Sequence, residues 1–431
     1  MSRPVLTPHG SSPDRTPFRG SGSRTVAGVG LSLLCRLLAG CGAEGSPPQD
    51  EEPRVRYPIG LAADPSGARV YAVGANFDRK YRAGVLRAID TATDRFVADA
   101  VQEVPGFAGG LALQVVDGQP PRLVVPARGD DSVSLIRIGS SPPFSCGADD
   151  VGRCNPSYRL SNDKTSSSGI GVGDDPIGVF VEPLGGGAAR LHVVATSDGQ
   201  VTVVDLAAAP TATAGAAAPP VAAALVDRFT LVTGLSAVVA APLSGRSYVT
   251  SSRSRLLRVY RIGALNDAKK PYGAILEPSI ELPASRSRDF GRGMALSADG
   301  SRVYVAWRSP DALVVLDVAP NRAGVPRNAV VDVIGIGREP AQVALATLAP
   351  DREIAYVSCF GEDAVWAVDV QQRAVVGVMR LAFAPHALSA VKTPAGWKLY
   401  ATLFEAHTIV ALPLTADGRF VAGAAIVQVK P

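Results

Sequence analysis

Ionisable side chains are scarce in this chain. Only 19% of the 431 residues are charged, and four are histidines, the usual acids and bases of catalysis. There is no Cys-x-x-Cys-His stretch, which excludes covalent attachment of c-type haem. There is also no Gly-x-Ser-x-Gly, so the nucleophile elbow of an α/β-hydrolase is absent. No cluster of histidines and carboxylates marks a metal centre, and no acidic loop has calcium-loop spacing. We therefore expect no metal and no cofactor.

The chain also lacks a basic surface. Its formal charge is +4, but residues 1–40 hold five arginines and one aspartate. The remainder is formally neutral, so the electrostatic footprint of a nucleic-acid-binding protein is missing.

The N-terminal apolar run Thr25–Leu34 is too short to span a bilayer comfortably. It follows Arg19 and Arg24 and leads to Leu38-Ala-Gly-Cys41, the order of a secretory signal. The tetrapeptide resembles the bacterial lipobox, which implies a signal peptide over 1–40 and lipidation of Cys41. A plain cleaved signal or a disordered leader is the alternative, since Arg36 interrupts the run. The long stretch before Thr25 indicates a start assigned too far upstream. Residues 41–53, rich in Gly, Pro and acids, are expected to form a flexible tether.

One phrase recurs seven times in the rest of the chain. Its tyrosine stands at Tyr71, Tyr248, Tyr304, Tyr356 and Tyr400, and is replaced by Val124 and His192 in two repeats. A basic residue stands two positions earlier in six repeats, and Asp closes a following apolar run in four. Each repeat reads as four short strands joined by tight turns. Repeats of this length with that composition predict an all-β fold, a seven-bladed β-propeller of four-stranded antiparallel blades.

The repeats resemble those of YVTN-type β-propeller proteins, which are exported by bacteria and archaea. Tyr248-Val-Thr-Ser nearly spells that name, and Pro58-Ile-Gly-Leu, Pro176-Ile-Gly-Val and Pro385-His-Ala-Leu match the way such blades begin. The resemblance covers residues 54–431 and implies a scaffold rather than an activity.

Residues 139–175 depart from the repeat and are interpreted as an insertion between blades two and three. In an exported protein, Cys146 and Cys154 within it predict a disulfide closing a small loop. A metal site is the alternative, although no histidine stands near. Residues 207–224, rich in Ala, Pro and Thr, are expected to form a loose excursion, and Cys359 a buried free thiol.

The loops that enter each innermost strand are the most charged short loops. They supply Asp174, Asp175, Arg288 and Arg338 as candidate ligand- or partner-binding residues. A ring of loops that carry both positive and negative side chains would suit a small polar or anionic ligand, or would simply be a solvated channel mouth.

Histidine gives the few catalytic candidates. His386 opens an inner strand and is the best placed general base, with Glu339, Arg292 and Asp289 as the residues that would have to converge on it. A structural role is the alternative. His192 takes a tyrosine position and is expected to pack, and His407 lies in a hairpin loop.

Together these patterns predict an exported, lipid-anchored, monomeric propeller of the bacterial cell envelope, facing the periplasm or exterior. We expect a non-catalytic binding or scaffold module for an envelope protein or a small polar ligand. The alternative is a propeller enzyme, a lactone hydrolase or dehydrogenase-type subunit, with its site at the channel mouth; an electron-transfer partner is a third. Either residues 421–429 or residues 54–57 would supply the strand that closes the ring.

Overall fold

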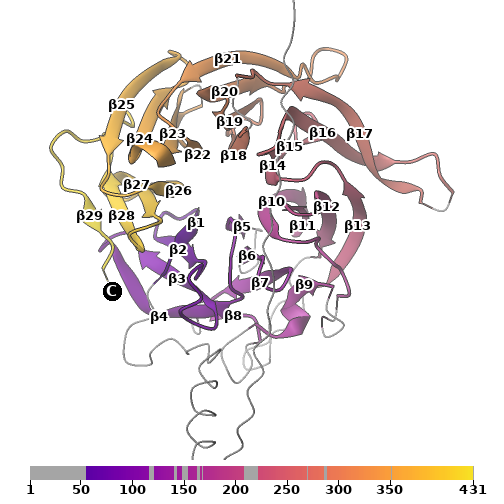
Figure 1. Cartoon of the computed structure of the whole chain (residues 1–431), viewed down its shortest axis with the longest axis horizontal. Coiled ribbons are helices and arrows are strands. Elements are labelled where there is room, and N and C mark those ends of the chain that lie inside the picture. Colours follow the sequence, from indigo (N-terminus) through magenta and orange to yellow (C-terminus); the bar gives the residue numbers. More distant parts are fainter. Residues whose placement is uncertain are drawn as a thin grey trace, which may run out of the picture. The chain divides into compact units, whose positions relative to one another are not determined.

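The computed structural model describes residues 55–115, 121–139, 143–147, 154–162, 166, 168–207, 222–268, 270–285, 289–350 and 352–430. The predicted signal peptide, Cys41 and the tether lie outside these residues. Within them the sheets form a ring of seven antiparallel blades, which confirms the predicted fold (Figure 1). Two short 3-10 helices are the only helical elements in this described part: Pro156–Tyr158 (η1) and Phe360–Glu362 (η2).

Each blade is a meander of consecutive strands, and the first strand lies nearest the axis. Blade one comprises Pro58–Ala63 (β1), Arg69–Gly74 (β2), Gly84–Asp90 (β3) and Arg95–Val104 (β4). Blade two comprises Ala112–Gln114 (β5), Arg122–Ala127 (β6), Ser132–Ile138 (β7), Phe144–Ser145 (β8) and Arg159–Ser161 (β9). Blade three comprises Pro176–Gly185 (β10), Ala188–Ala195 (β11), Gln200–Leu206 (β12) and Ala223–Thr230 (β13). Blade four comprises Leu235–Ala241 (β14), Arg246–Ser251 (β15), Ser254–Ala264 (β16) and Tyr272–Glu281 (β17).

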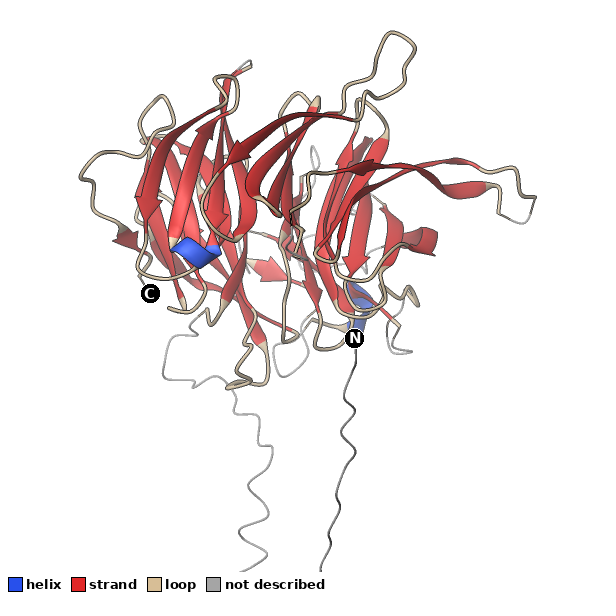
Figure 2. Cartoon of the chain, turned by 45° about the horizontal axis from the view of Figure 1, so that its top comes forward, coloured by secondary structure: helices blue, strands red, loops and turns tan. Residues whose placement is uncertain are grey.

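The remaining blades follow the same order. Blade five comprises Gly291–Leu296 (β18), Arg302–Arg308 (β19), Asp311–Asp317 (β20) and Ala329–Gly335 (β21). Blade six comprises Pro340–Ala349 (β22), Arg352–Cys359 (β23), Ala364–Asp369 (β24) and Ala374–Arg380 (β25). Blade seven comprises Pro385–Thr393 (β26), Gly396–Leu403 (β27), Thr408–Pro413 (β28) and Val427–Gln428 (β29). Figure 2 views the ring at an angle and shows the hairpin of β16 and β17 projecting from its side.

The middle strands are buried on both faces because a neighbouring blade covers each face. Every residue of β6 and β7 is buried, whereas exposed and half-buried residues alternate along most of the outer strand β21. The core is accordingly a series of apolar layers between neighbouring blades.

In blades four to seven, the repeated tyrosine ties one blade to the next. Its hydroxyl donates to Asn328 from Tyr248, to Glu353 from Tyr304, and to the Gly418 carbonyl from Tyr356. His192, at the same position, is fully buried, and its Nδ1 lies 2.5 Å from the Tyr260 hydroxyl of blade four. Burial of a phenol is favourable only when its hydroxyl is satisfied, so these contacts fix how adjacent blades stack.

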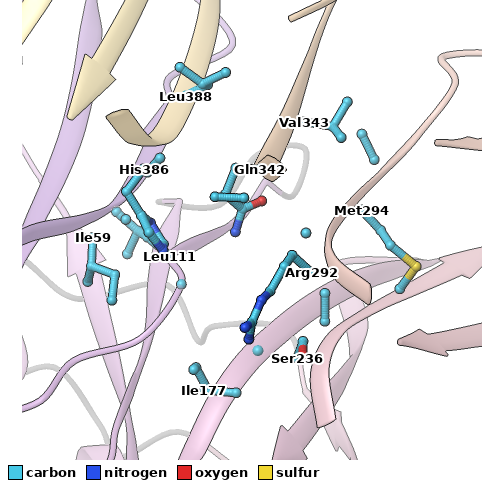
Figure 3. Close-up of a pocket in the computed structure, with 18 of the residues that line it drawn as sticks. Ile59, Leu111, Ile177, Ser236, Arg292, Met294, Gln342, Val343, His386 and Leu388 are labelled. Carbon is cyan, nitrogen blue, oxygen red and sulfur yellow. The ribbon is translucent and has the colours of Figure 1, made fainter. Parts of the chain in front are cut away.

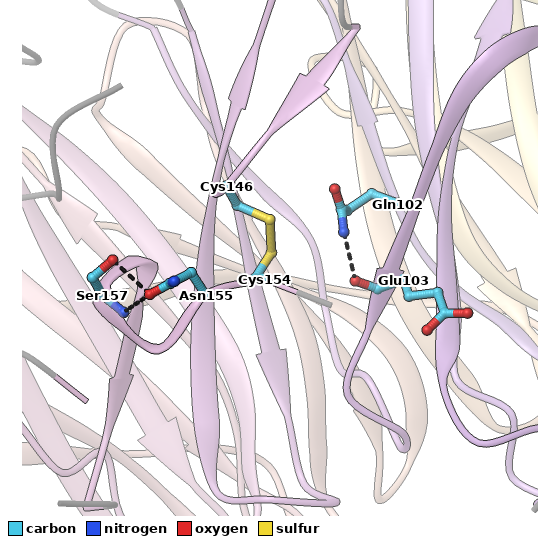
Figure 4. The surroundings of a disulfide bond; sticks show 6 residues. All are labelled: Gln102, Glu103, Cys146, Cys154, Asn155 and Ser157. Atoms are coloured by element: carbon cyan, nitrogen blue, oxygen red, sulfur yellow. Dashed lines mark hydrogen bonds between the residues drawn. A yellow bond between two sulfur atoms is a disulfide. The ribbon is translucent and has the colours of Figure 1, made fainter. Parts of the chain in front are cut away.

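Blade two differs from the expectation at its outer edge. Its fourth strand is split into β8 and β9, and both pair with β7. The segment 139–175 is therefore not wholly an insertion between blades, since it supplies this edge. A disulfide joins Cys146, which follows β8, to Cys154, which precedes β9 (Figure 4). It connects the two halves of the split edge.

The ring closes with each blade built from one continuous segment. The strand β29 is the outer strand of blade seven, so the first of the two predicted closures is the one observed. At the seam, the ammonium of Lys398 in blade seven lies 2.8 and 2.9 Å from the carboxylate oxygens of Asp94 in blade one. The Tyr400 hydroxyl donates to the same carboxylate. The backbones of Lys430 and Arg95 form an isolated parallel β-bridge. Residues 55–57 also reach across, since the Tyr57 N–H donates to His407 Nδ1 at 3.1 Å.

Candidate functional site

The propeller has a central cavity of about 530 Å³. The innermost strands of the blades form its walls, with loops that follow the second strands. Most of the residues that line it are apolar, and Figure 3 shows Ile59, Leu111, Ile177, Met294, Val343 and Leu388 around it. The volume is that of a typical small-molecule site.

A β-bulge near the start of the innermost strand selects which residue faces the cavity. The register shifts between the first and third residues of β1, β10, β14 and β22, and between the first and fourth residues of β18 and β26. A bulge bends the strand and redirects a side chain. The residues at these shifts all line the cavity: Ile59, Ile177, Ser236, Arg292, Ala341 and His386. Of these six, only Arg292 and His386 are ionisable.

Arg292 extends into the cavity (Figure 3). Its Nη2 donates to both carboxylate oxygens of Asp289, at 2.8 and 2.9 Å. Asp289 also accepts from Arg308 Nη1 at 3.0 Å, so one carboxylate serves two guanidinium groups. The Nε of Arg292 is buried and has no partner among the described residues. Burial, and then the charge of Arg308, lower the pKa of Arg292 below its ordinary value.

Arg308 is held by a backbone carbonyl as well as by carboxylates. Its Nε donates to the Pro340 carbonyl at 2.9 Å, and its Nη1 lies 3.8 Å from the Glu339 carboxylate. The Glu339 side chain is 56% exposed and stands at the edge of the cavity, while its backbone N–H donates to Asp311. The cluster of Arg292, Arg308, Asp289 and Glu339 therefore balances in formal charge, and Arg292 is the member that stands on an innermost strand, β18.

His386 points into the cavity from blade seven (Figure 3). Removal from water lowers its pKa to about 4, the positive charges of Arg308 and Arg292 add to this, and a hydrogen bond with the Ile59 backbone opposes it. Its Nδ1 is buried without a partner among the described residues. The ring is therefore neutral at pH 7, and the described residues provide no carboxylate bonded to it.

Aromatic rings surround His386 at one side of the cavity. Phe360 and Phe404 lie with ring centroids 6.5 and 6.1 Å from the imidazole, and Phe77 lies 5.6 Å from Phe404. All three phenylalanines are half-buried and line the cavity. They come from blades one, six and seven, so the ring closure brings them together.

The sequence-predicted residues divide into two groups. Arg292, Glu339 and His386 line the same cavity, and Asp289 is bonded to Arg292 without lining it. Asp174, Asp175 and Arg338 lie on loops and do not line the cavity. Asp175 pairs with Arg128 at 3.3 Å, the Asp174 N–H donates to Asp198, and the Arg338 N–H donates to Glu362. Arg288 lies outside the described residues.

Several lining residues were not predicted as site residues. Arg308, Phe360 and Phe404 each stand four positions after the repeated tyrosine, as do Thr196 and Ser252 in their repeats, and all five line the cavity. The position after the entry proline likewise gives Ile59, Ile177 and His386. Both positions can be read from the repeat, but the sequence alone does not say that they face the axis.

The described residues lack a metal-binding cluster and a membrane-spanning helix. They hold no group of three or more His, Cys, Asp or Glu side chains placed to bind a metal ion. Among them we also find no helix with the length and apolarity needed to cross a membrane.

No protein-family model matches the chain, and no curated protein matches its sequence. Membership of the YVTN-type family therefore stays a prediction.

Solved structures do resemble the fold. The Cps50 (Swd1) β-propeller domain of Myceliophteria thermophila aligns with a TM-score of 0.54 at 10% identity, over 84% of this chain and 98% of that one. Hydrazine synthase of Kuenenia stuttgartiensis aligns with a TM-score of 0.52 at 13% identity, over 86% and 99%. A functionally unknown protein of Desulfotomaculum acetoxidans aligns with a TM-score of 0.52 at 12% identity, over 80% and 96%. At such identities the likeness shows the fold alone, and that fold is a seven-bladed β-propeller.

Proposed function

We propose that this protein is a non-catalytic binding module of the bacterial cell envelope, and that its small ligand occupies the central cavity. The observation that carries the proposal is the set of bulged residues that six blades direct into one cavity of ligand size. Bulges next to a cavity are a common way to aim side chains at a ligand. If the module binds a protein instead of a small ligand, we expect that protein to contact the polar loops around the cavity mouth.

Catalysis is the second candidate, because Arg292, Glu339 and His386 line the same cavity. A hydrolase would need His386 as general base, yet its pKa of about 4 makes it a weak one at neutral pH. The described residues also place no carboxylate in a hydrogen bond with its ring to orient it. The arrangement therefore favours binding over a lactone hydrolase or a dehydrogenase-type subunit.

The cavity is tested with N-phenyl-1-naphthylamine, a neutral probe that fluoresces in apolar surroundings. We expect the purified chain to bind one equivalent saturably. Ser236→Trp would weaken this binding because the indole occupies part of the cavity that the Ser236 side chain faces.

The matched control is Leu243→Trp, at an exposed position in the β14–β15 turn, which should bind the probe as the parent does. If Ser236→Trp fails to fold by circular dichroism, Ala341→Leu narrows the same cavity with a smaller change. Absence of binding by the parent chain, or full binding by the blocked variants, would contradict the proposal.

The envelope location is a separate part of the proposal, and it rests on the lipobox-like Leu38-Ala-Gly-Cys41. A lipid on Cys41 would hold the chain to a membrane. In a bacterial expression host, we expect the parent chain in the membrane fraction and the Cys41→Ser variant in the soluble exported fraction. Equal fractionation of the two would contradict lipid anchoring and leave the cavity proposal untouched.

A further inference from the structure

We propose that the cavity takes a small organic monoanion, with an apolar or aromatic body and a single acidic group seated on Arg292. This inference rests on the proposed function, because it names the class of ligand for the same cavity. Three observations support it: the position of Arg292, the charge state of its surroundings, and the composition of the rest of the wall.

Arg292 has donor capacity left over. Both hydrogen bonds that it donates to described residues leave from Nη2, and its buried Nε has no partner there. Its acceptor, Asp289, is shared with Arg308. A buried donor without an acceptor is costly, and guanidinium groups bind carboxylates and similar acids through paired N–H donors. Because Nη1 donates to no described residue and the Arg292 side chain is 34% exposed, an acidic group entering the cavity would find donors there.

The residues around Arg292 leave one cation available to a negatively charged ligand. Among the six bulged residues, Arg292 is the only one charged at neutral pH, since His386 is neutral there. Arg308 is already engaged by Asp289, the Pro340 carbonyl and, more distantly, Glu339. A second acidic group on the ligand would have no free cation among the described lining residues, and a buried charge without a partner is strongly unfavourable. A monoanion is thus favoured over a dianion.

The rest of the wall is suited to a hydrophobic body. Phe360 and Phe404 lie beside the neutral ring of His386, Phe77 packs against Phe404, and aliphatic residues of the inner strands also line the cavity. Gln342 adds one polar group near the centre (Figure 3). An aromatic or aliphatic acid would bury its body against these rings.

The experiment compares two probes that share an aryl-naphthalene body. One is the neutral N-phenyl-1-naphthylamine, and the other is the monoanionic 8-anilino-1-naphthalenesulfonate. In the purified full chain, Arg292→Gln is expected to weaken binding of the sulfonate about tenfold, the loss of one charged hydrogen bond. Binding of the neutral probe should change less than about twofold, which also shows that the variant keeps its cavity.

The matched control is Arg327→Gln, because Arg327 is a largely exposed arginine paired with Asp317 and does not line the cavity. It should leave both probes unaffected. Arg292→Lys keeps the charge without the planar fork and should restore part of the sulfonate affinity. Equal effects of Arg292→Gln on both probes, or no effect on the sulfonate, would overturn the monoanion inference while the cavity proposal stands. If neither probe binds the parent chain, the proposed function itself fails.

Discussion

Replacing Asp94 with glycine is expected to destabilise the whole ring by about 3 kcal/mol, because it leaves a partly buried cation unpaired. The Lys398 and Asp94 side chains are only 19% and 12% exposed, and the buried Tyr400 hydroxyl donates to the same carboxylate. Glycine suits the backbone, since Asp94 has a φ of 53°. For a domain of this size the change corresponds to a fall in melting temperature of roughly 4 °C, measurable by calorimetry.

Two companion variants show whether the seam is responsible. Adding Lys398→Met to the Asp94→Gly chain removes the unpaired cation and should recover part of the lost stability. Glu281→Gln breaks an ion pair with Arg255 whose side chains are 62% and 54% exposed, and it should cost less than about 0.5 kcal/mol. A melting temperature for Asp94→Gly within 1 °C of the parent would mean that this contact does not fasten the ring.

The second large effect is a loss of folding stability at acidic pH. His386 has a pKa of about 4 in the folded chain, against an ordinary value of 6.5. Between these pH values the unfolded chain binds more protons, so stability falls as the pH decreases from 6.5 to 4. The contribution is fully present above pH 6.5 and amounts to at most about 3 kcal/mol. We expect the urea midpoint of the parent to fall more steeply over this range than that of His386→Gln.

His407→Gln serves as the control for this pH effect. His407 also has a lowered pKa, but it lies in the loop between β27 and β28, near Arg56 and Asp78 rather than the two cavity arginines. Its replacement should change the pH slope less than His386→Gln does. Parallel profiles for the parent and His386→Gln would show that the imidazole does not pass from water into a poorly solvated, positively charged site on folding.

The repeated features of the sequence were enough to predict the blades. The tyrosine with its preceding basic residue, the turn residues and the short apolar runs describe neighbours along the chain. In blade three, for example, Arg190 lies beside Asp205 on the adjacent strand, with its Nε 2.7 Å from the carboxylate. Strand, turn and next strand form within one repeat, so the information for them is local.

Single departures from the repeat carry less information. The sequence predicts an insertion over 139–175 because Phe144–Ser145 and Arg159–Ser161 are too short to be recognised as strands. They count as the edge of blade two only because β7 offers them hydrogen-bonding partners. Asp174, Asp175 and Arg338 appeared as site candidates from their charge, yet their loops use those charges or backbones to pair with neighbouring loops.

The sequence by itself determined the architecture of seven four-stranded blades, and it singled out Arg292, Glu339 and His386 among few ionisable residues. Only the tertiary structure decided that these three line one cavity, that Arg292 shares Asp289 with Arg308, and that three phenylalanines from blades one, six and seven lie together. The physical reason is distance along the chain. A blade is specified by contacts within one repeat, whereas the cavity is specified by bulges and ring closure that join residues more than 300 positions apart.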